Sequence, residues 1–243
     1  MKVLLWAERQ KLHRSKIVWI TVFATVMVAV VVYAQGQFIF YGSRYIDGAG
    51  WYMKAAQSLA TLYVLPGVIA LLGSYMICRE EQEDTMKSLQ LIPINETKLT
   101  VAKMVVAFVF SLLIYLLLFV IVFVVEAILH IQDLSVEMTL GFLKVYLLDG
   151  AGVFLAISPI IALVSRLKKG YWLALVFTEI YSFAGLFASM SATLKIFYPI
   201  TAVFNLSGYY KATTMEMIAG LAALLLCGCL SVLVLKGKRS GRA

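Results

Sequence analysis

The segment MVVAFVFSLLIYLLLFVIVFVV, residues 104–125, contains no charged residue. A helix rises ~1.5 Å per residue, so a stretch of this length can cross the ~30 Å hydrocarbon core of a bilayer. The whole chain of 243 residues has a similar bias, with 62% hydrophobic and only 14% charged residues. A soluble domain needs roughly 25% charged residues to cover its surface. The sequence therefore predicts an integral membrane protein.

Further apolar runs of similar length predict an all-α protein with six spans in a single transmembrane domain, residues 1–243. The expected spans are residues 17–38, 55–78, 104–125, 145–165, 170–194 and 217–235. Each run has a length typical of a membrane-crossing helix. Asp149 interrupts the fourth run and Glu179 interrupts the fifth.

Lysine and arginine are distributed unevenly between the two sides that six spans would create. The termini and the loops after the second and fourth spans hold 16 of the 21 basic residues, and the opposite side holds 5. Basic loop residues favour the cytoplasmic side, so both termini are expected in the cytoplasm. The net charge of +8 then has a topological origin, and nucleic-acid binding is not expected.

Two segments outside the spans are expected to be helical. Residues 1–16 predict an interfacial helix on the cytoplasmic membrane surface, anchored by Trp6 and leucines, with basic residues at the headgroups. An ordinary basic topology signal is the alternative. Residues 196–216 are apolar and aromatic, and Pro199 and Gly208 interrupt them. This pattern predicts a re-entrant outer segment of one or two short helices before the sixth span, and a plain external loop is the alternative.

An acidic segment, CREEQEDTMKSLQLIP at residues 78–93, follows the second span on the expected cytoplasmic side. A helix over residues 79–94 would place Met86 and Leu89 on one narrow apolar stripe and would be closed by Pro93. A short rigid helix of this kind offers a surface that a partner protein can bind. Its acids would require a basic or polar complement on that partner.

The same segment resembles the motif E-x-x-G-T-x-x-x-L-x-x-x-P that ABC-2 type transporter permeases carry after their second span. The matching residues are Glu81, Thr85, Leu89 and Pro93, with Lys103 beyond them. Asp84 stands where the family has glycine. The six spans, the N-terminal interfacial helix and the re-entrant segment are also similar, so the resemblance covers the whole chain. The opening WAERQKLHRSK looks like that of lantibiotic-immunity and bacitracin-resistance permeases.

The resemblance implies that residues 79–94 are the coupling helix, which docks into a groove of a separate ABC ATPase. The residues implied at that contact are Glu80, Glu81, Thr85, Met86, Leu89 and Pro93. The resemblance also implies two cytoplasmic ATPase subunits, which bind ATP and Mg²⁺, and a second permease subunit, identical or homologous. It further implies export of an amphipathic substrate, such as a lantibiotic or other antimicrobial peptide, from the bacterial plasma membrane.

Three acids lie in or near the expected spans, and intramembrane carboxylates are functional candidates by default. Glu179 is expected near mid-depth and Asp149 in the outer quarter, where either could attract a cationic amphiphile. Glu126 is expected near the outer surface, with His130 four residues later on the same helix face. These three acids are therefore the candidates for the substrate path. A structural role as paired or protonated acids is the alternative.

Enzyme functions find little support. The chain has only two histidines, no H-E-x-x-H motif and no G-x-x-x-x-G-K-[ST] phosphate-binding loop, so neither a catalytic metal nor a nucleotide is expected on it. Besides the exporter, two functions remain open: an ATP-independent membrane scaffold or sensor, and an ion-coupled transporter that uses Glu179 or Asp149 as a proton site. Both alternatives predict that no ATPase partner is needed.

Overall fold

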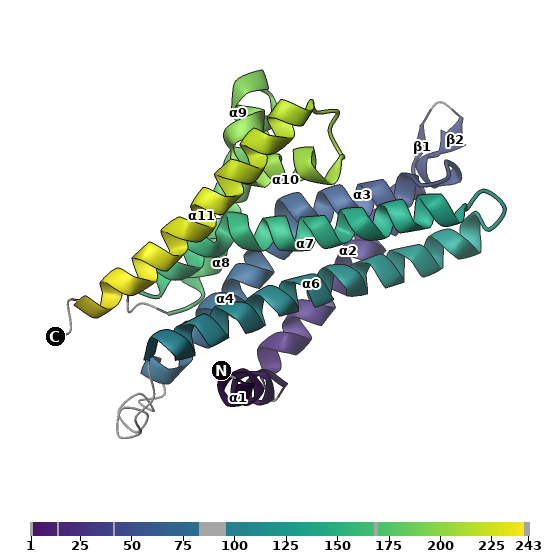
Figure 1. The fold of residues 1–243 in the computed structure, drawn as a ribbon. Coiled ribbons are helices and arrows are strands. Elements are labelled where there is room, and N and C mark those ends of the chain that lie inside the picture. The colour runs from purple at the N-terminus through teal and green to yellow at the C-terminus, as the bar shows by residue number, and fades with distance from the viewer. Residues whose placement is uncertain (1, 14, 41, 83–95, 168–169, 241–243) are drawn as a thin grey trace.

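The computed structural model describes residues 2–13, 15–40, 42–82, 96–167 and 170–240. Within these ranges the chain is a bundle of helices with one short hairpin of two strands (Figure 1). The coupling residues predicted at Thr85, Met86, Leu89 and Pro93 lie outside the described residues.

The long elements of the bundle account for all six predicted apolar runs. They are α2 (Lys16–Gly36), α3 (Trp51–Leu59) continued by η2 (Ala60–Val64) and α4 (Leu65–Gln82), α6 (Glu96–Leu129), α7 (Val136–Val164), α8 (Leu173–Ser189) and α11 (Thr214–Ser240). In the described part of the chain, five helices are long and apolar enough to cross a membrane. The sixth, α8, is apolar but shorter, because its helix ends well before the predicted boundary at residue 194.

The second apolar run forms a helix with one irregular turn. The segment η2 is a π-helix, in which the N–H of Leu65 bonds to the carbonyl of Ala60, five residues earlier instead of four. Pro66 follows at once and has no N–H to donate to a preceding carbonyl. A π-turn accommodates one extra residue in a helix, so the positions of α4 that face a given neighbour are shifted by one residue from the regular pattern of α3.

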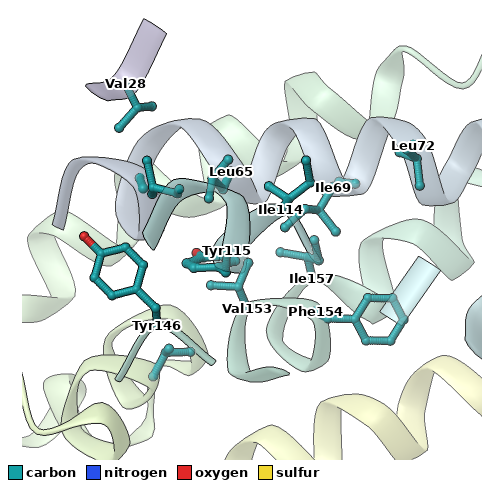
Figure 2. Close-up of a cluster of buried hydrophobic side chains, with 14 of the residues drawn as sticks. Val28, Leu65, Ile69, Leu72, Ile114, Tyr115, Tyr146, Val153, Phe154 and Ile157 are labelled. Atoms are coloured by element: carbon teal, nitrogen blue, oxygen red, sulfur yellow. The ribbon is translucent and has the colours of Figure 1, made fainter. Parts of the chain in front are cut away.

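The centre of the bundle is formed by the second run and by α7. In the most apolar part of α3–α4, 67% of the residues are buried inside the chain. The corresponding share is 61% for α7 and 17% for α11. α4 packs against α6, α7 and α8, while α6 and α11 both lie along α7. Figure 2 shows the apolar contacts at this centre, where side chains of α4, α6 and α7 meet, among them Leu65, Ile69, Ile114, Val153 and Ile157.

The two ends of the bundle are built differently (Figure 1). The helix α1 (Lys2–His13) and the C-terminal end of α11 lie toward one end. The hairpin, the turn between α6 and α7, and the short helices α9 (Ala192–Phe197) and α10 (Pro199–Ser207) lie toward the other. The two termini thus lie toward the same end of the bundle.

A short hairpin interrupts the otherwise helical chain, which the sequence did not predict. β1 (Ile39–Phe40) pairs antiparallel with β2 (Ser43–Arg44), and the short turn η1 (Tyr45–Asp47) follows it. The preceding helix ends at Gly36. Strands of two residues leave no alternation of apolar and polar positions that a sequence could reveal.

Two short helices precede α11. Of these, α10 lies within the segment predicted at residues 196–216, whereas α9 lies mostly before it. Tyr198 between them is extended, with ψ 121°, which is the conformation favoured before a proline. Pro199 then occupies the first turn of α10, and Gly208 ends it with a positive φ of 82°. α10 packs between α7 and α11 and is almost entirely buried. Its depth in a membrane stays a prediction.

Candidate functional site

Four charged side chains meet at the end of the bundle that holds α1. We call this group the ionic cluster, and its members are Glu8 and Lys11 of α1, Glu80 of α4 and Lys103 of α6. Glu8 is 3% exposed, and Glu80 and Lys103 are each 4% exposed. Buried charges of this kind are tolerated only when they are paired and hydrogen-bonded.

Every member of the ionic cluster has an opposite charge in contact or nearby. Lys103 Nζ lies 2.8 Å from Glu80 Oε2 and 4.0 Å from Glu8 Oε2. It also donates a hydrogen bond of 2.6 Å to the carbonyl of Met76. Lys11 Nζ lies 2.8 Å from Glu80 Oε1 and 2.9 Å from Glu8 Oε1. Two cations and two anions therefore balance one another across three separate helices.

Lys11 is the more exposed of the two cations, with 40% of its side chain accessible. Burial alone would lower the pKa of Lys11, but the hydrogen bonds to Glu80 and Glu8 raise the pKa above the ordinary lysine value of 10.5. The acids thus stabilise the charged form of Lys11.

The position of the ionic cluster links α1 to the predicted coupling segment. Glu80 lies in the last turns of α4 and Lys103 lies near the start of α6, so these two residues bracket the chain between the helices. Glu8 and Lys11 attach α1 to both. A displacement of either helix end therefore has to move α1 or break an ion pair.

A second polar group, which we call the Asp149 cluster, lies where α3, η2, α6, α7 and α10 converge. Its members are Asp149, Gln57, Thr61, Tyr115 and Ser207. Asp149 Oδ2 accepts hydrogen bonds from Gln57 Nε2 at 2.7 Å and from Thr61 Oγ1 at 3.4 Å. Gln57 Nε2 also lies 3.4 Å from Ser207 Oγ, and the Tyr115 hydroxyl donates to Thr61 Oγ1 at 3.2 Å. The group ties the short helix α10 to the centre of the bundle.

Glu126, fully buried near the end of α6, caps a neighbouring helix. Its Oε1 accepts a hydrogen bond of 2.6 Å from the Gly50 N–H and lies 3.1 Å from His130 Nδ1. Gly50 precedes α3 and has a φ of +78°, a conformation that other residues rarely adopt. The Glu126 carboxyl group lies at the positive end of α3, where an acceptor for the helix N–H groups is favourable. It joins α3 to α6, and the predicted pair of Glu126 with His130 is confirmed.

Glu179 is half-buried on α8 and faces α4. A side chain at Gly67 of α4 would collide with the Glu179 carboxylate, so glycine lets the acid approach the α4 backbone. Three buried hydroxyls along the same two helices have no hydrogen-bond partner within the described residues, namely Ser74 of α4 and Thr178 and Ser182 of α8. We call the contact between these helices the α4–α8 seam. It is polar and incompletely satisfied.

Comparison with known proteins gives a match to the family described as ABC-2 family transporter protein over residues 4–185, which is most of the chain. The chain belongs to the ABC-2 family of transporter proteins. The match includes the whole ionic cluster and ends before α9. Family membership and the apolar helices together make it a multi-pass membrane protein.

This ABC-2 protein is also similar to a bacitracin transport permease protein of Bacillus licheniformis. The two are 32% identical over 118 residues, which is 49% of this chain and 55% of that relative. The matched part therefore spans about half of the relative's length. The resemblance to ABC-2 permeases, including those of bacitracin resistance, is confirmed by these two comparisons.

The structure of this ABC-2 protein gives Glu80 internal partners that its sequence did not predict. The sequence assigned Glu80 to the contact with an ATPase, whereas its carboxylate here lies inside the chain between Lys11 and Lys103. Glu81 belongs to the last turn of α4. Two signals could have indicated the cluster: the Glu8–Lys11 pair, three residues apart on one helix, and the opposite charges of Glu80, at the start of the acidic segment, and Lys103, beyond its end.

The substrate-path candidates separate into two groups. Asp149 and Glu126 are fully buried inside the chain, whereas Glu179 is half-buried. Sequence analysis missed Gln57, Thr61 and Gly50 as partners of the buried acids, because uncharged residues in apolar runs give no signal of their own. Contact between any of the three acids and a substrate stays a prediction.

A separate apolar groove lies between α6, α7 and α11 of this protein. Its cavity volume is about 390 Å³, and Met104, Phe108, Phe154 and Val232 are among its lining residues. None of the three intramembrane acids lines it. Its chemistry suits hydrocarbon, so in a bilayer an acyl chain can fill it.

Proposed function

We propose that this ABC-2 protein is the permease subunit of an ATP-driven exporter that expels an amphipathic substrate from the membrane. Its family membership carries the proposal. The similar protein of Bacillus licheniformis is named a bacitracin transport permease, which supports an antimicrobial peptide, such as a lantibiotic, as the class of substrate. The biological role is then resistance or self-immunity of the producing cell.

The energy would come from a partner, because no phosphate-binding loop is present in the sequence. Two cytoplasmic ABC ATPases would bind ATP and Mg²⁺ and would contact residues 79–94 as the coupling helix. The ionic cluster supports this assignment, since it fixes both helix ends beside that segment to α1. Force applied there would reach α1, α4 and α6 together.

The substrate path would run along the α4–α8 seam. Glu179 supports this placement, because it is half-buried and no basic side chain of the described residues forms an ion pair with it. A cationic, amphipathic substrate would find both a carboxyl group and apolar surface there. A second permease subunit, identical or homologous, would close the path on its open side.

We place the protein in the bacterial plasma membrane with both termini in the cytoplasm. The distribution of basic residues, 16 against 5, supports this orientation. The shared end of the two termini in Figure 1 is consistent with it.

The first test is to isolate the full chain gently from its native membrane and to weigh the intact assembly by native mass spectrometry. We expect ABC ATPase subunits in stoichiometric amount and a second permease subunit. An intact assembly without any ATPase would contradict the exporter and favour the scaffold or the ion-coupled transporter.

The coupling segment has its own test, the double substitution of Met86→Asp with Leu89→Asp. Two acids on the apolar stripe should abolish ATPase association and peptide resistance, because the stripe would no longer be apolar. Ser88→Asp is the matched control, since a helix over this segment would place residue 88 away from the apolar stripe. Full association and resistance in the double variant would show that this segment does not couple the two subunits.

A further inference from the structure

The Asp149 cluster contains a carboxylate with no opposite charge beside it. Asp149 is 0% exposed, and no lysine, arginine or histidine of the described residues pairs with it. The buried acids Glu8 and Glu80, in contrast, both contact Lys11. Asp149 must therefore be neutralised in another way.

The hydrogen bonds of the cluster satisfy only one of the two carboxylate oxygens. Gln57 and Thr61 both donate to Oδ2. Tyr115 donates to Thr61, which leaves the Thr61 hydrogen free to point at Asp149. Within the described residues, Oδ1 has no hydrogen-bond partner.

The groups around Asp149 offer dipoles and no charge. The titratable groups that face it are the phenols of Tyr115 on α6 and Tyr146 on α7. The segments α3, η2 and α10 reach the cluster through Gln57, Thr61 and Ser207, and none of these side chains ionises. An ionised carboxylate with one bare oxygen in this setting is far less stable than the neutral acid, which leaves no net charge uncompensated.

We propose that Asp149 is a proton-binding site, and that its bound proton keeps α10 seated against α3 and α7. Ser207 closes the link, because it is the last residue of α10 and contacts the same Gln57 amide that binds Asp149. The contact between α10 and α7 is close. A side chain at Gly152, one turn along α7 from Asp149, would come within 3.0 Å of Val203 on α10.

Release of the proton would place a bare negative charge inside this contact. Water or a cation would then have to enter, and both require α10 to separate from α3 and α7. The proton is thus linked to the position of α10. This inference does not require an ATPase partner, so it stands apart from the proposed export function.

Protonation can be observed directly by infrared spectroscopy of the full chain in membranes, with Asp149→Asn as the nearly isosteric comparison. We expect a carbonyl band of a neutral carboxylic acid at neutral pH that is absent from the Asp149→Asn spectrum. The band should disappear at alkaline pH. Identical spectra of the two proteins in the acid region at neutral pH would show that Asp149 is ionised and would overturn the proposal.

The link to α10 needs a second measurement, for which a cysteine at Asn205 is suitable. Asn205 lies on α10 and is 2% exposed. The background would have Cys78, Cys227 and Cys229 replaced by alanine, and the probe would be a membrane-impermeant maleimide applied over a range of pH. The same cysteine in the Asp149→Asn chain reports the thiol's own pH dependence and serves as the matched control.

We expect labelling at Asn205→Cys to rise with pH more steeply when Asp149 is present, by up to about tenfold per pH unit for one released proton. Equal pH dependence in both backgrounds would overturn the link between the proton and α10. Labelling that follows sodium concentration at constant pH, and not pH, would identify a metal cation as the ligand and would also overturn the proposal.

Discussion

The ionic cluster and the Asp149 cluster both bury carboxylates, but only the ionic cluster supplies cations to balance them. Lys11 can join the ionic cluster because its side chain is 40% exposed, and a lysine at a membrane surface keeps its head near water. Asp149 lies deep between helices, where basic side chains are costly, and its neighbours are amides and hydroxyls. At the end of the bundle that holds α1, lysines thus neutralise the buried acids, whereas we propose that a proton neutralises Asp149.

Among the substitutions that test this difference, Lys103→Met should have the largest effect on stability. It would leave Glu8 and Glu80 buried with Lys11 alone, and removing one partner of a buried ion pair costs about 3 to 5 kcal/mol of stability. Thermal unfolding of the purified full chain would measure the loss. The double variant Lys103→Met with Glu80→Gln should recover part of it, because one uncompensated charge is gone. A Lys103→Met chain as stable as the wild type would show that the buried pair is unimportant.

Gln57→Leu removes the shortest hydrogen bond to Asp149. We expect a loss of about 1 to 3 kcal/mol, since a buried acceptor loses its main donor. The matched control is Ser58→Ala, which removes a half-buried hydroxyl of the same helix that donates to the carbonyl of Ala55. Comparable thermal shifts for the two variants would mean that the Asp149 cluster adds little to stability.

Lys11→Met tests the exposed side of the ionic cluster. Because water screens this lysine, its loss should cost only about 0.2 to 1 kcal/mol, and the cost should shrink as salt is added. The pKa of Lys11 is raised in the folded state. Its contribution is therefore full below pH 10.5 and is lost as the pH rises through the higher folded value. A loss of stability that does not depend on salt would show that the ion pairs of Lys11 are as shielded from solvent as those of Lys103.

Glu179→Gln should change stability least, by no more than about 0.5 kcal/mol, because the acid is half-buried and forms no ion pair with the described residues. Peptide resistance of cells that carry this variant should nevertheless fall. Thermal unfolding and a resistance assay on the same variant separate the two effects. Unchanged resistance would remove Glu179 from the substrate path.

Local patterns in the sequence were enough to locate the long helices and the Glu126–His130 pair. Long apolar runs indicate helices, and a spacing of four residues along a helix brings two side chains together. The partners of Glu80 and Asp149 could not be predicted in the same way. They come from other helices, and which faces meet depends on how those helices rotate and pack.

The irregular elements escaped sequence analysis for a different reason. Gln57 and Thr61 are neutral residues inside an apolar run, and the π-turn that follows Gln57 has no distinct composition. The run at residues 170–194 is long enough to span, yet its helix α8 ends at Ser189 and a new short helix begins at Ala192. Hydropathy reports which residues avoid water, and it does not report where a helix stops.

The π-turn η2 fixes the relation between the two clusters, because Gln57 precedes it and Glu80 follows it on one helix. Each residue turns an α-helix by about 100°. If the same residues wound as a regular α-helix, without the wider turn at Ala60–Val64, α4 would be rotated against α3 by about that angle, and either Gln57 or Glu80 would face away from its partners. The wider turn therefore keeps the two halves of the helix in phase despite the extra residue. In an alignment, relatives with a gap of one residue at this turn should form a regular helix there and can keep both clusters.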